Sequence, residues 1–175
     1  MFRKSTLIFV VTGTQAPFDR LLNIINQFAE GKQDLKIIAQ TALSDSDFNN
    51  MECYDYIEPY VFDDIFNKAD IIIGHAGMGT IIKALVNEKR LLVFPRIVEF
   101  KEHRNEHQLN TAVSFKKLNM INVAFSENEL KEYLCNFDQI EVKKQISNFA
   151  EEKLIDALTY LLIINNTYLY HQIKK

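Results

Sequence analysis

The 175-residue sequence is poor in the residues that mark specialised protein classes. It has two cysteines, three prolines, five glycines and no tryptophan. So little proline and glycine argues against a disordered or fibrous chain. Cys53 and Cys135 lie far apart and lack the short spacing of a metal motif. We therefore expect two buried thiols in a reducing compartment rather than a disulfide.

Long apolar runs are also missing. Residues 7–11 form a run of strand length, and residues 161–164 fall far short of the roughly 20 residues that span a bilayer. No small-residue cleavage site follows the basic start of the chain, so no signal peptide is predicted. We expect a soluble chain in the cytoplasm.

Neither charge sign dominates the composition. Twenty basic and twenty-three acidic residues give a net charge of −3, which excludes a global positive field for nucleic acid. The 47% hydrophobic content is that of a globular protein, and the length suits one domain over residues 1–175.

Apolar runs alternate with segments of helical periodicity along the chain. Strands are predicted at residues 7–11, 35–39, 56–61, 70–73, 91–94 and 120–124. Helices are predicted at residues 17–30, 62–69, 80–87, 105–117 and 126–135, with a terminal helix and tail at about 140–175. This alternation predicts an α/β fold with a doubly wound, Rossmann-like parallel sheet covered on both faces.

Three polar segments follow predicted strands, where ligands bind in such folds. Residues 12–15 (TGTQ) and 74–80 (GHAGMGT) combine glycines with helix starts, whose N–H groups and partial positive charge favour phosphate. The glycines are spaced G-x-x-G-x-G, which is neither the dinucleotide fingerprint nor a P-loop. The alternative is that they only let strand and helix pack closely.

Two side chains near these loops have open roles. His75 either donates a hydrogen bond to a phosphate or sugar, which makes it the one catalytic candidate, or is a structural histidine. Arg96 is either an anion clamp or a solvated surface arginine.

The third segment, residues 102–108 (EHRNEHQ), is a run of seven polar residues suited to sugar hydroxyls. A solvated helix start is the alternative. The segment also matches the H-x-x-E-H pattern of inverted zinc peptidases, which would place His103 and His107 on one helical face. A zinc hydrolase is therefore a remote alternative.

Residues 9–15, 17–21 (PFDRL), 69–80, 95–96 and 102–108 together resemble the family 28 glycosyltransferase C-terminal domain. The sequence is most similar to PssE-type exopolysaccharide glycosyltransferase subunits. These in turn resemble the soluble catalytic subunit that adds the second N-acetylglucosamine in eukaryotic lipid-linked oligosaccharide synthesis. The resemblance covers about residues 7–125 and implies the C-terminal, donor-binding half of a GT-B enzyme.

The resemblance also implies what the site holds. It implies a UDP-sugar as substrate and no metal or other cofactor, with the diphosphate on residues 13–15 and 77–80. It places backbone near Phe62 against the uracil and residues 103–108 near the donor. Together, the residues and the resemblance predict these donor-binding residues: Gly13, Thr14, Gln15, Phe62, His75, Gly77, Met78, Gly79, Thr80, Arg96, His103, Arg104, Asn105, His107 and Gln108. Lys83 stands where related enzymes hold the ribose with a glutamate.

A GT-B enzyme needs a second, acceptor-binding half, for which this chain has no residues. The resemblance implies a membrane-associated partner subunit that presents a polyprenyl-diphosphate-linked sugar at the cytoplasmic face, in exopolysaccharide or capsule synthesis. The expected reaction is transfer with inversion, and its general base is not identified. The apolar stripe of Phe149, Leu158 and Leu162 either docks on that partner or packs in the core. The rival from another class is a non-catalytic subunit that enhances a partner transferase.

Overall fold

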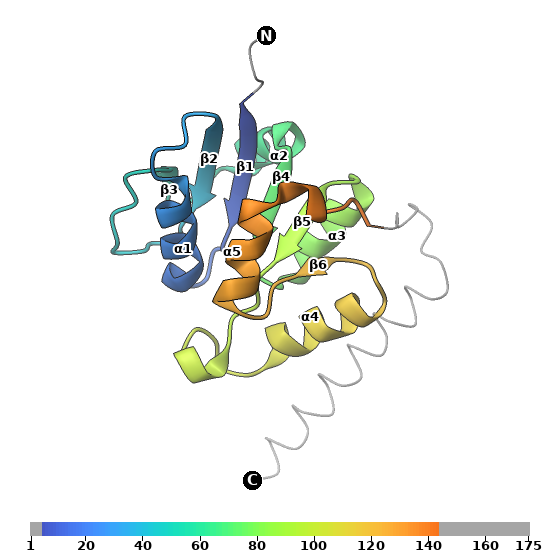
Figure 1. Ribbon diagram of the computed structural model, residues 1–175. Coiled ribbons are helices and arrows are strands. Elements are labelled where there is room, and N and C mark those ends of the chain that lie inside the picture. Colours follow the sequence, from blue (N-terminus) through green and yellow to red (C-terminus); the bar gives the residue numbers. More distant parts are fainter. Residues whose placement is uncertain (1–4, 144–175) are drawn as a thin grey trace.

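The computed structural model describes residues 5–143 and shows one twisted parallel sheet between two layers of helices (Figure 1). The strand order is β3-β2-β1-β4-β5-β6, and every neighbouring pair is parallel. The strands are β1 (Thr6–Val11), β2 (Leu35–Gln40), β3 (Glu52–Tyr54), β4 (Ile71–Gly74), β5 (Arg90–Val93) and β6 (Asn122–Val123). The predicted fold class is confirmed.

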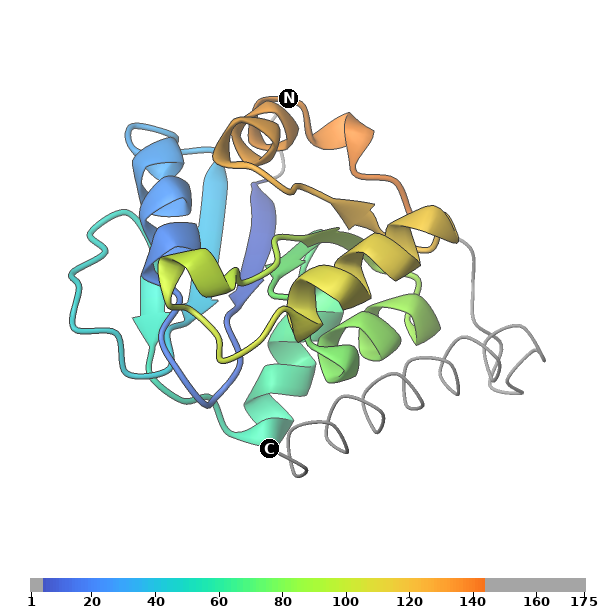
Figure 2. The same ribbon diagram turned by 90° about the horizontal axis from the view of Figure 1, so that it is seen from below.

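The helices divide between the two faces of the sheet (Figure 2). Helices α1 (Asp19–Ala29) and α5 (Glu127–Cys135) cover one face. The other face carries α2 (Pro59–Lys68), α3 (Met78–Val86) and α4 (His107–Lys117). Two short 3₁₀ helices, η1 (Val98–Phe100) and η2 (Phe137–Gln139), complete the described elements. No helix within residues 5–143 has the length and apolarity needed to cross a membrane.

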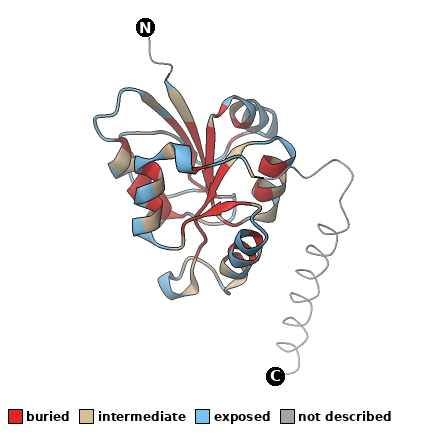
Figure 3. Cartoon of the chain, turned by 45° about the vertical axis from the view of Figure 1, so that its right-hand side comes forward, coloured by how far each residue is buried: buried red, intermediate tan, exposed pale blue. Residues whose placement is uncertain are grey.

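The central strand β1 shows why its sequence is a continuous apolar run. Ile8 and Val10 pack into the core under α1 and α5, whereas Phe9 and Val11 pack into the core under the other three helices. A strand that is buried on both faces needs apolar residues at every position. The middle strands are accordingly buried, together with the helix residues that face them (Figure 3).

The third strand and the cysteines differ from the sequence predictions. The prediction of a strand at residues 56–61 is wrong, because β3 ends at Tyr54 and Pro59 begins α2. Proline suits the first helical turn, where its missing N–H costs nothing. The residues of β3 are all exposed, so this edge strand has no apolar pattern to detect. Cys53 and Cys135 are free but exposed, so the prediction of buried thiols is also wrong.

Two details concern helix ends. The predicted cap at Ser126 is confirmed, since its side chain accepts a hydrogen bond from the Glu129 N–H at the start of α5. Helix α4 begins at His107, two residues later than predicted. The predicted helix beyond residue 143, with its apolar stripe, lies outside the described residues.

Candidate functional site

The strand order places a cleft at the carboxyl ends of β1, β4 and β5. The chain winds in opposite directions from β1 and β4, and such a reversal separates the loops that follow the two strands. The resulting cleft has a volume of about 330 Å³. It is lined by Thr12, Gly13, Thr14, Gln15, Ala16, His75, Gly77, Gly79, Thr80, Arg96, Glu102, His103 and Gln108. The three polar segments singled out in the sequence therefore do meet.

The loop after β1 turns through Gly13, whose φ of +88° belongs to the left-handed region that favours glycine. The Gly13 carbonyl accepts a hydrogen bond of 2.9 Å from the Gln40 side chain. Because a trans peptide points its N–H away from its carbonyl, the Thr14 N–H is directed away from Gln40. Within residues 5–143, the N–H groups of Gly13, Thr14 and Gln15 have no hydrogen-bond acceptor.

The loop after β4 is short and runs directly into α3, with Gly77 as the N-cap. No side chain caps this helix, and its first intrahelical acceptor is the Gly77 carbonyl, which binds the Ile81 N–H at 3.1 Å. The N–H groups in the first turn of α3, which precede Ile81, therefore remain available. Together with the partial positive charge of the helix start they form an anion-binding surface beside the cleft.

His75 lies between the two glycine loops. A Cβ built at Gly13 would lie 2.9 Å from the His75 Nε2 atom, and one built at Gly77 would lie 2.2 Å from Cε1. Only residues without a side chain leave room for this ring. The glycines therefore admit a specific side chain, which goes beyond the close packing of strand and helix that the sequence left open.

Burial lowers the pKa of His75. Desolvation, helped by electrostatic interactions with Arg96 and His103, lowers the pKa of His75 to about 4, although a hydrogen bond with the Gln108 side chain opposes the shift. The imidazole is therefore neutral near pH 7, with one donor and one acceptor nitrogen. Its Nδ1 is buried and has no partner among the described residues. A buried polar atom without a partner, in a residue that lines the cleft, marks His75 as a candidate site residue.

Arg96 is buried, with 4% of its surface exposed, so its interpretation as a solvated surface arginine is wrong. Its guanidinium donates to the main-chain carbonyls of Thr12, Ala16 and Pro17 in the loop after β1, at 2.6 to 2.9 Å. Burial lowers the pKa of Arg96, while the carboxylates of Glu102 and Asp19 act in the opposite direction. The side chain lines the cleft, but its donors hold the first loop in place.

Only some residues of the third segment, residues 102–108, line the cleft. Glu102, His103 and Gln108 line the cleft, and the Gln108 Oε1 accepts the Arg96 N–H at 3.2 Å. Arg104, Asn105 and His107 do not line it.

The zinc alternative loses its geometric basis. His103 precedes α4, whose first residue is His107, so the two histidines do not share a helical face. The His103 Nδ1 lies 3.0 Å from the Asn105 carbonyl oxygen. Within residues 5–143, no group of three or more His, Cys, Asp or Glu residues is placed to hold a metal ion.

Phe62 and Met78 also lie outside the lining of the cleft. Phe62 sits in α2, packs edge-on against Phe9 at 5.0 Å between ring centroids, and donates its N–H to the Glu58 carbonyl. The contact predicted between uracil and the backbone near Phe62 would therefore need a main-chain group other than this N–H, and it stays a prediction. Lys83 forms an ion pair with Asp63.

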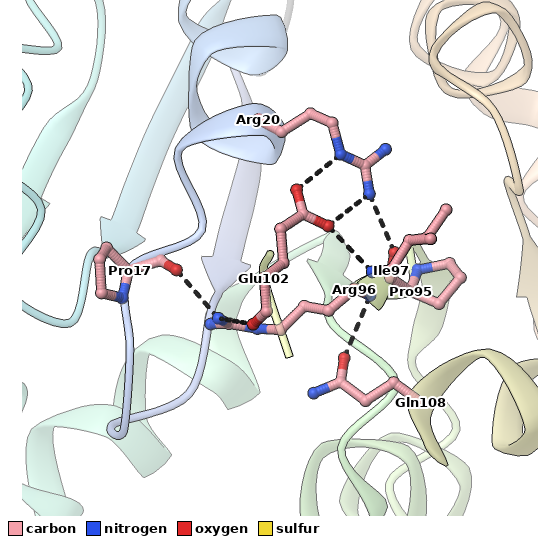
Figure 4. A network of polar contacts seen from close by, with 7 residues as sticks. All are labelled: Pro17, Arg20, Pro95, Arg96, Ile97, Glu102 and Gln108. Carbon is pink, nitrogen blue, oxygen red and sulfur yellow. Dashed lines mark hydrogen bonds and ion pairs between the residues drawn. The ribbon is translucent and has the colours of Figure 1, made fainter. Parts of the chain in front are cut away.

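Arg20 and Gln40 belong to this site although no sequence motif predicted them. The Arg20 guanidinium binds the Glu102 carboxylate through two hydrogen bonds of 2.7 and 2.8 Å (Figure 4). The partners are 82 residues apart in the chain, and no local pattern links residues at that distance. Only the PFDRL segment, in which Arg20 stands, drew attention to this region.

Solved structures with a similar fold include glycosyltransferases. MurG of Acinetobacter baumannii matches 95% of this chain and 51% of its own at 15% identity, with a TM-score of 0.60. The glycotransferase of kitacinnamycin matches 91% of this chain and 38% of its own at 14% identity, with a TM-score of 0.58. The NMR structure of ALG13 matches 81% of this chain and 89% of its own at 18% identity, with a TM-score of 0.52.

The chain thus spans about half the length of MurG and less than half that of the kitacinnamycin glycotransferase, but most of the length of ALG13. No curated protein sequence matches it. The profile of the glycosyltransferase family 28 C-terminal domain matches residues 7–158, which is most of the chain. This protein is therefore a member of the glycosyltransferase family 28 C-terminal domain family.

Proposed function

We propose that this chain binds a UDP-sugar in the cleft and forms the donor-binding half of a two-chain, inverting glycosyltransferase. The observation that carries the proposal is the convergence of main-chain N–H groups on one cleft. One set follows β1 at Gly13, Thr14 and Gln15, and the other opens α3. A diphosphate is the ligand whose oxygens match two such sets at once.

In the proposed reaction, an acceptor hydroxyl displaces UDP at the anomeric carbon with inversion. Negative charge develops on the departing diphosphate, and fixed N–H groups and a helix start stabilise such charge without reorganising. The hydroxyls of Thr14 and Thr80 and the neutral ring of His75 add donors at the same place. In this proposal the chain's own residues stabilise the leaving group and no metal takes part.

The sugar would lie toward the third segment, where His103 and Gln108 line the cleft. Arg104, Asn105 and His107 stay predicted donor contacts that a ligand extending past the cleft would reach. The general base that removes the acceptor proton belongs, in this proposal, to the other half of the enzyme.

The acceptor-binding half is proposed to be a separate, membrane-associated chain that presents a polyprenyl-diphosphate-linked sugar, as in PssE-type exopolysaccharide or capsule systems. The support is the coverage: the chain matches about half of MurG but 89% of ALG13. Co-purification with a membrane-associated glycosyltransferase subunit would test the pairing.

The donor site is tested by calorimetric titration of the chain with UDP, with and without EDTA. Gly79 lines the cleft in the first turn of α3, and a Cβ there meets nothing within 4 Å. Gly79→Asp therefore adds a carboxylate without a clash. An acidic residue at a helix start stabilises the helix, so a loss of binding would not reflect unfolding.

We expect metal-independent UDP binding in the wild type, its retention in Gly79→Ala and at least a tenfold loss in Gly79→Asp, which corresponds to about 1.4 kcal/mol. Equal binding by the two variants would place UDP elsewhere. No binding by any form, alone or with the partner, would favour the non-catalytic enhancer.

A further inference from the structure

Two arginine side chains connect the loop after β1 with the segment after β5, one from each side. Arg96 follows β5 and reaches the loop after β1, whereas Arg20 begins in α1, directly after that loop, and reaches the segment after β5 (Figure 4). The two connections meet at Glu102. Its main-chain carbonyl accepts a hydrogen bond from Arg96, and its carboxylate binds Arg20.

The Arg20 side of this connection is nearly buried. The side chains of Arg20 and Glu102 are 12% and 10% exposed. The Arg20 guanidinium also donates to the Pro95 carbonyl at 3.1 Å, and the Glu102 carboxylate accepts the Ile97 N–H at 3.0 Å. The pair therefore fixes both residues that flank Arg96 in the chain.

Aromatic rings surround the two guanidinium groups. The Arg20 Cζ lies 4.1 Å from the Phe94 ring centroid and 4.7 Å from that of Phe100. The Arg96 Cζ lies 4.8 Å from the Phe18 ring centroid, and the Phe18 and Phe94 rings stack at 5.9 Å. Planar guanidinium groups held by rings and by several acceptors have little freedom to rotate.

The direction of the peptide groups links this network to the ligand. The Thr12 carbonyl points to Arg96 at 2.8 Å, so the Gly13 N–H of the same trans peptide points the other way. If Arg96 moved, the carbonyls of the loop would lose their donor and the N–H groups their common direction.

We propose that Arg20 and Glu102 are positioning residues of the donor site, which hold Arg96 so that it turns the N–H groups of the first loop toward the diphosphate. The inference rests on the proposed function, since it assigns a role to residues around the same cleft. Neither side chain needs to contact the donor. An ion pair so well buried is seldom retained for stability alone, because apolar residues can fill the space at lower cost.

The test compares Glu102→Gln with Glu99→Gln. Glu99 lies in η1 of the same segment and is exposed, so both variants lose one carboxylate but only one loses the pair. The first measurement is the NMR spectrum of the guanidinium groups in each full-length chain. Hindered rotation gives separate Nη proton signals for Arg96 in the wild type.

We expect the Arg96 signals to merge in Glu102→Gln and to stay separate in Glu99→Gln, although neither substitution removes an acceptor atom of Arg96. UDP affinity should fall about tenfold or more in Glu102→Gln, equivalent to about 1.4 kcal/mol, and stay unchanged in Glu99→Gln. Arg20→Lys keeps the positive charge but not the bidentate hydrogen bonding to Glu102, and should give an intermediate UDP affinity.

Separate Arg96 signals and wild-type UDP affinity in a folded Glu102→Gln chain would overturn the inference and leave the donor site intact. If the wild type does not bind UDP, the donor site fails instead. The NMR comparison would then still decide whether the pair positions Arg96, because it needs no ligand.

Discussion

The two glycine loops of the cleft expose N–H groups in different ways. The loop after β4 is three residues long, and its donors come from the first turn of α3. The loop after β1 is longer, spans residues 12–18, and is held from outside by Arg96 and Gln40. In this site a short loop thus obtains its N–H donors from the helix that it enters, whereas a long loop depends on distant side chains to orient its N–H groups.

The largest effect is expected from removing the outside support. Arg96→Ala deletes a buried guanidinium that donates to three main-chain carbonyls of the first loop and should lower the free energy of unfolding by about 3–4 kcal/mol. Urea unfolding measures the change. Arg104→Ala, which removes an exposed arginine of the third segment, should stay within about 0.5 kcal/mol of wild type. Equal losses in the two variants would contradict the asymmetry between the loops.

His75, the ring between the loops, should make stability depend on pH. Its pKa of about 4 in the folded chain lies below the ordinary value of 6.5. Between pH 6.5 and pH 4 the ring is therefore protonated in the unfolded chain but neutral in the folded chain. The stability that the folded chain gains from burying the neutral ring is present above pH 6.5 and is lost as the pH falls toward 4. The loss should be about 2–3 kcal/mol, and His75→Gln should lack it.

Urea unfolding near neutral pH and in mild acid, for wild type and His75→Gln, measures this difference. Parallel pH profiles for the two chains would mean that the ring is not held neutral between the glycines.

The second loop is probed by adding one methyl group. Gly77→Ala places a Cβ against the His75 ring, which must move, so we expect a loss of about 1–3 kcal/mol in unfolding free energy and weaker UDP binding. Gly79→Ala adds the same group in open space within the helix and should raise stability by about 0.5 kcal/mol. If both variants behaved alike, His75 would not depend on the glycine at 77.

The smallest change is expected at Gln40, the second outside support of the first loop. Gln40→Leu keeps most of the buried volume but removes the hydrogen bond to the Gly13 carbonyl, at a cost of about 1 kcal/mol. UDP titration should show a weaker effect than that of Glu102→Gln, because Arg96 still holds Thr12, Ala16 and Pro17. A larger effect would make Gln40 the main support of the loop.

The elements that could be predicted from sequence are those whose signal is local. Doubly buried strands such as β1 and β4 are continuous apolar runs, and the Ser126 cap acts within one turn. The edge strand β3 was missed because exposed residues carry no periodic signal. The motifs at Gly13 and His75 were found for the same local reason, since their glycines stand next to strand ends.

The rest of the site could not be predicted because it depends on contacts across the fold. Whether Arg96 faces solvent or carbonyls is decided by a loop about 80 residues earlier in the chain. The Arg20–Glu102 pair is equally distant in sequence. Phe62 was assigned to the base by position alone, and this assignment stays a prediction; its own N–H bonds to Glu58 within α2.

The contacts of Arg96 also bear on how the first loop of this protein can be varied. Its acceptors in the first loop are main-chain oxygens of Thr12, Ala16 and Pro17, which any residue at those positions would supply. Thr14 and Gln15 are exposed at the cleft and take no part in that recognition. Substitutions at these two positions can therefore change what the loop offers a ligand while its path is preserved. A library randomised at positions 14 and 15 is a direct way to search for altered donor preference.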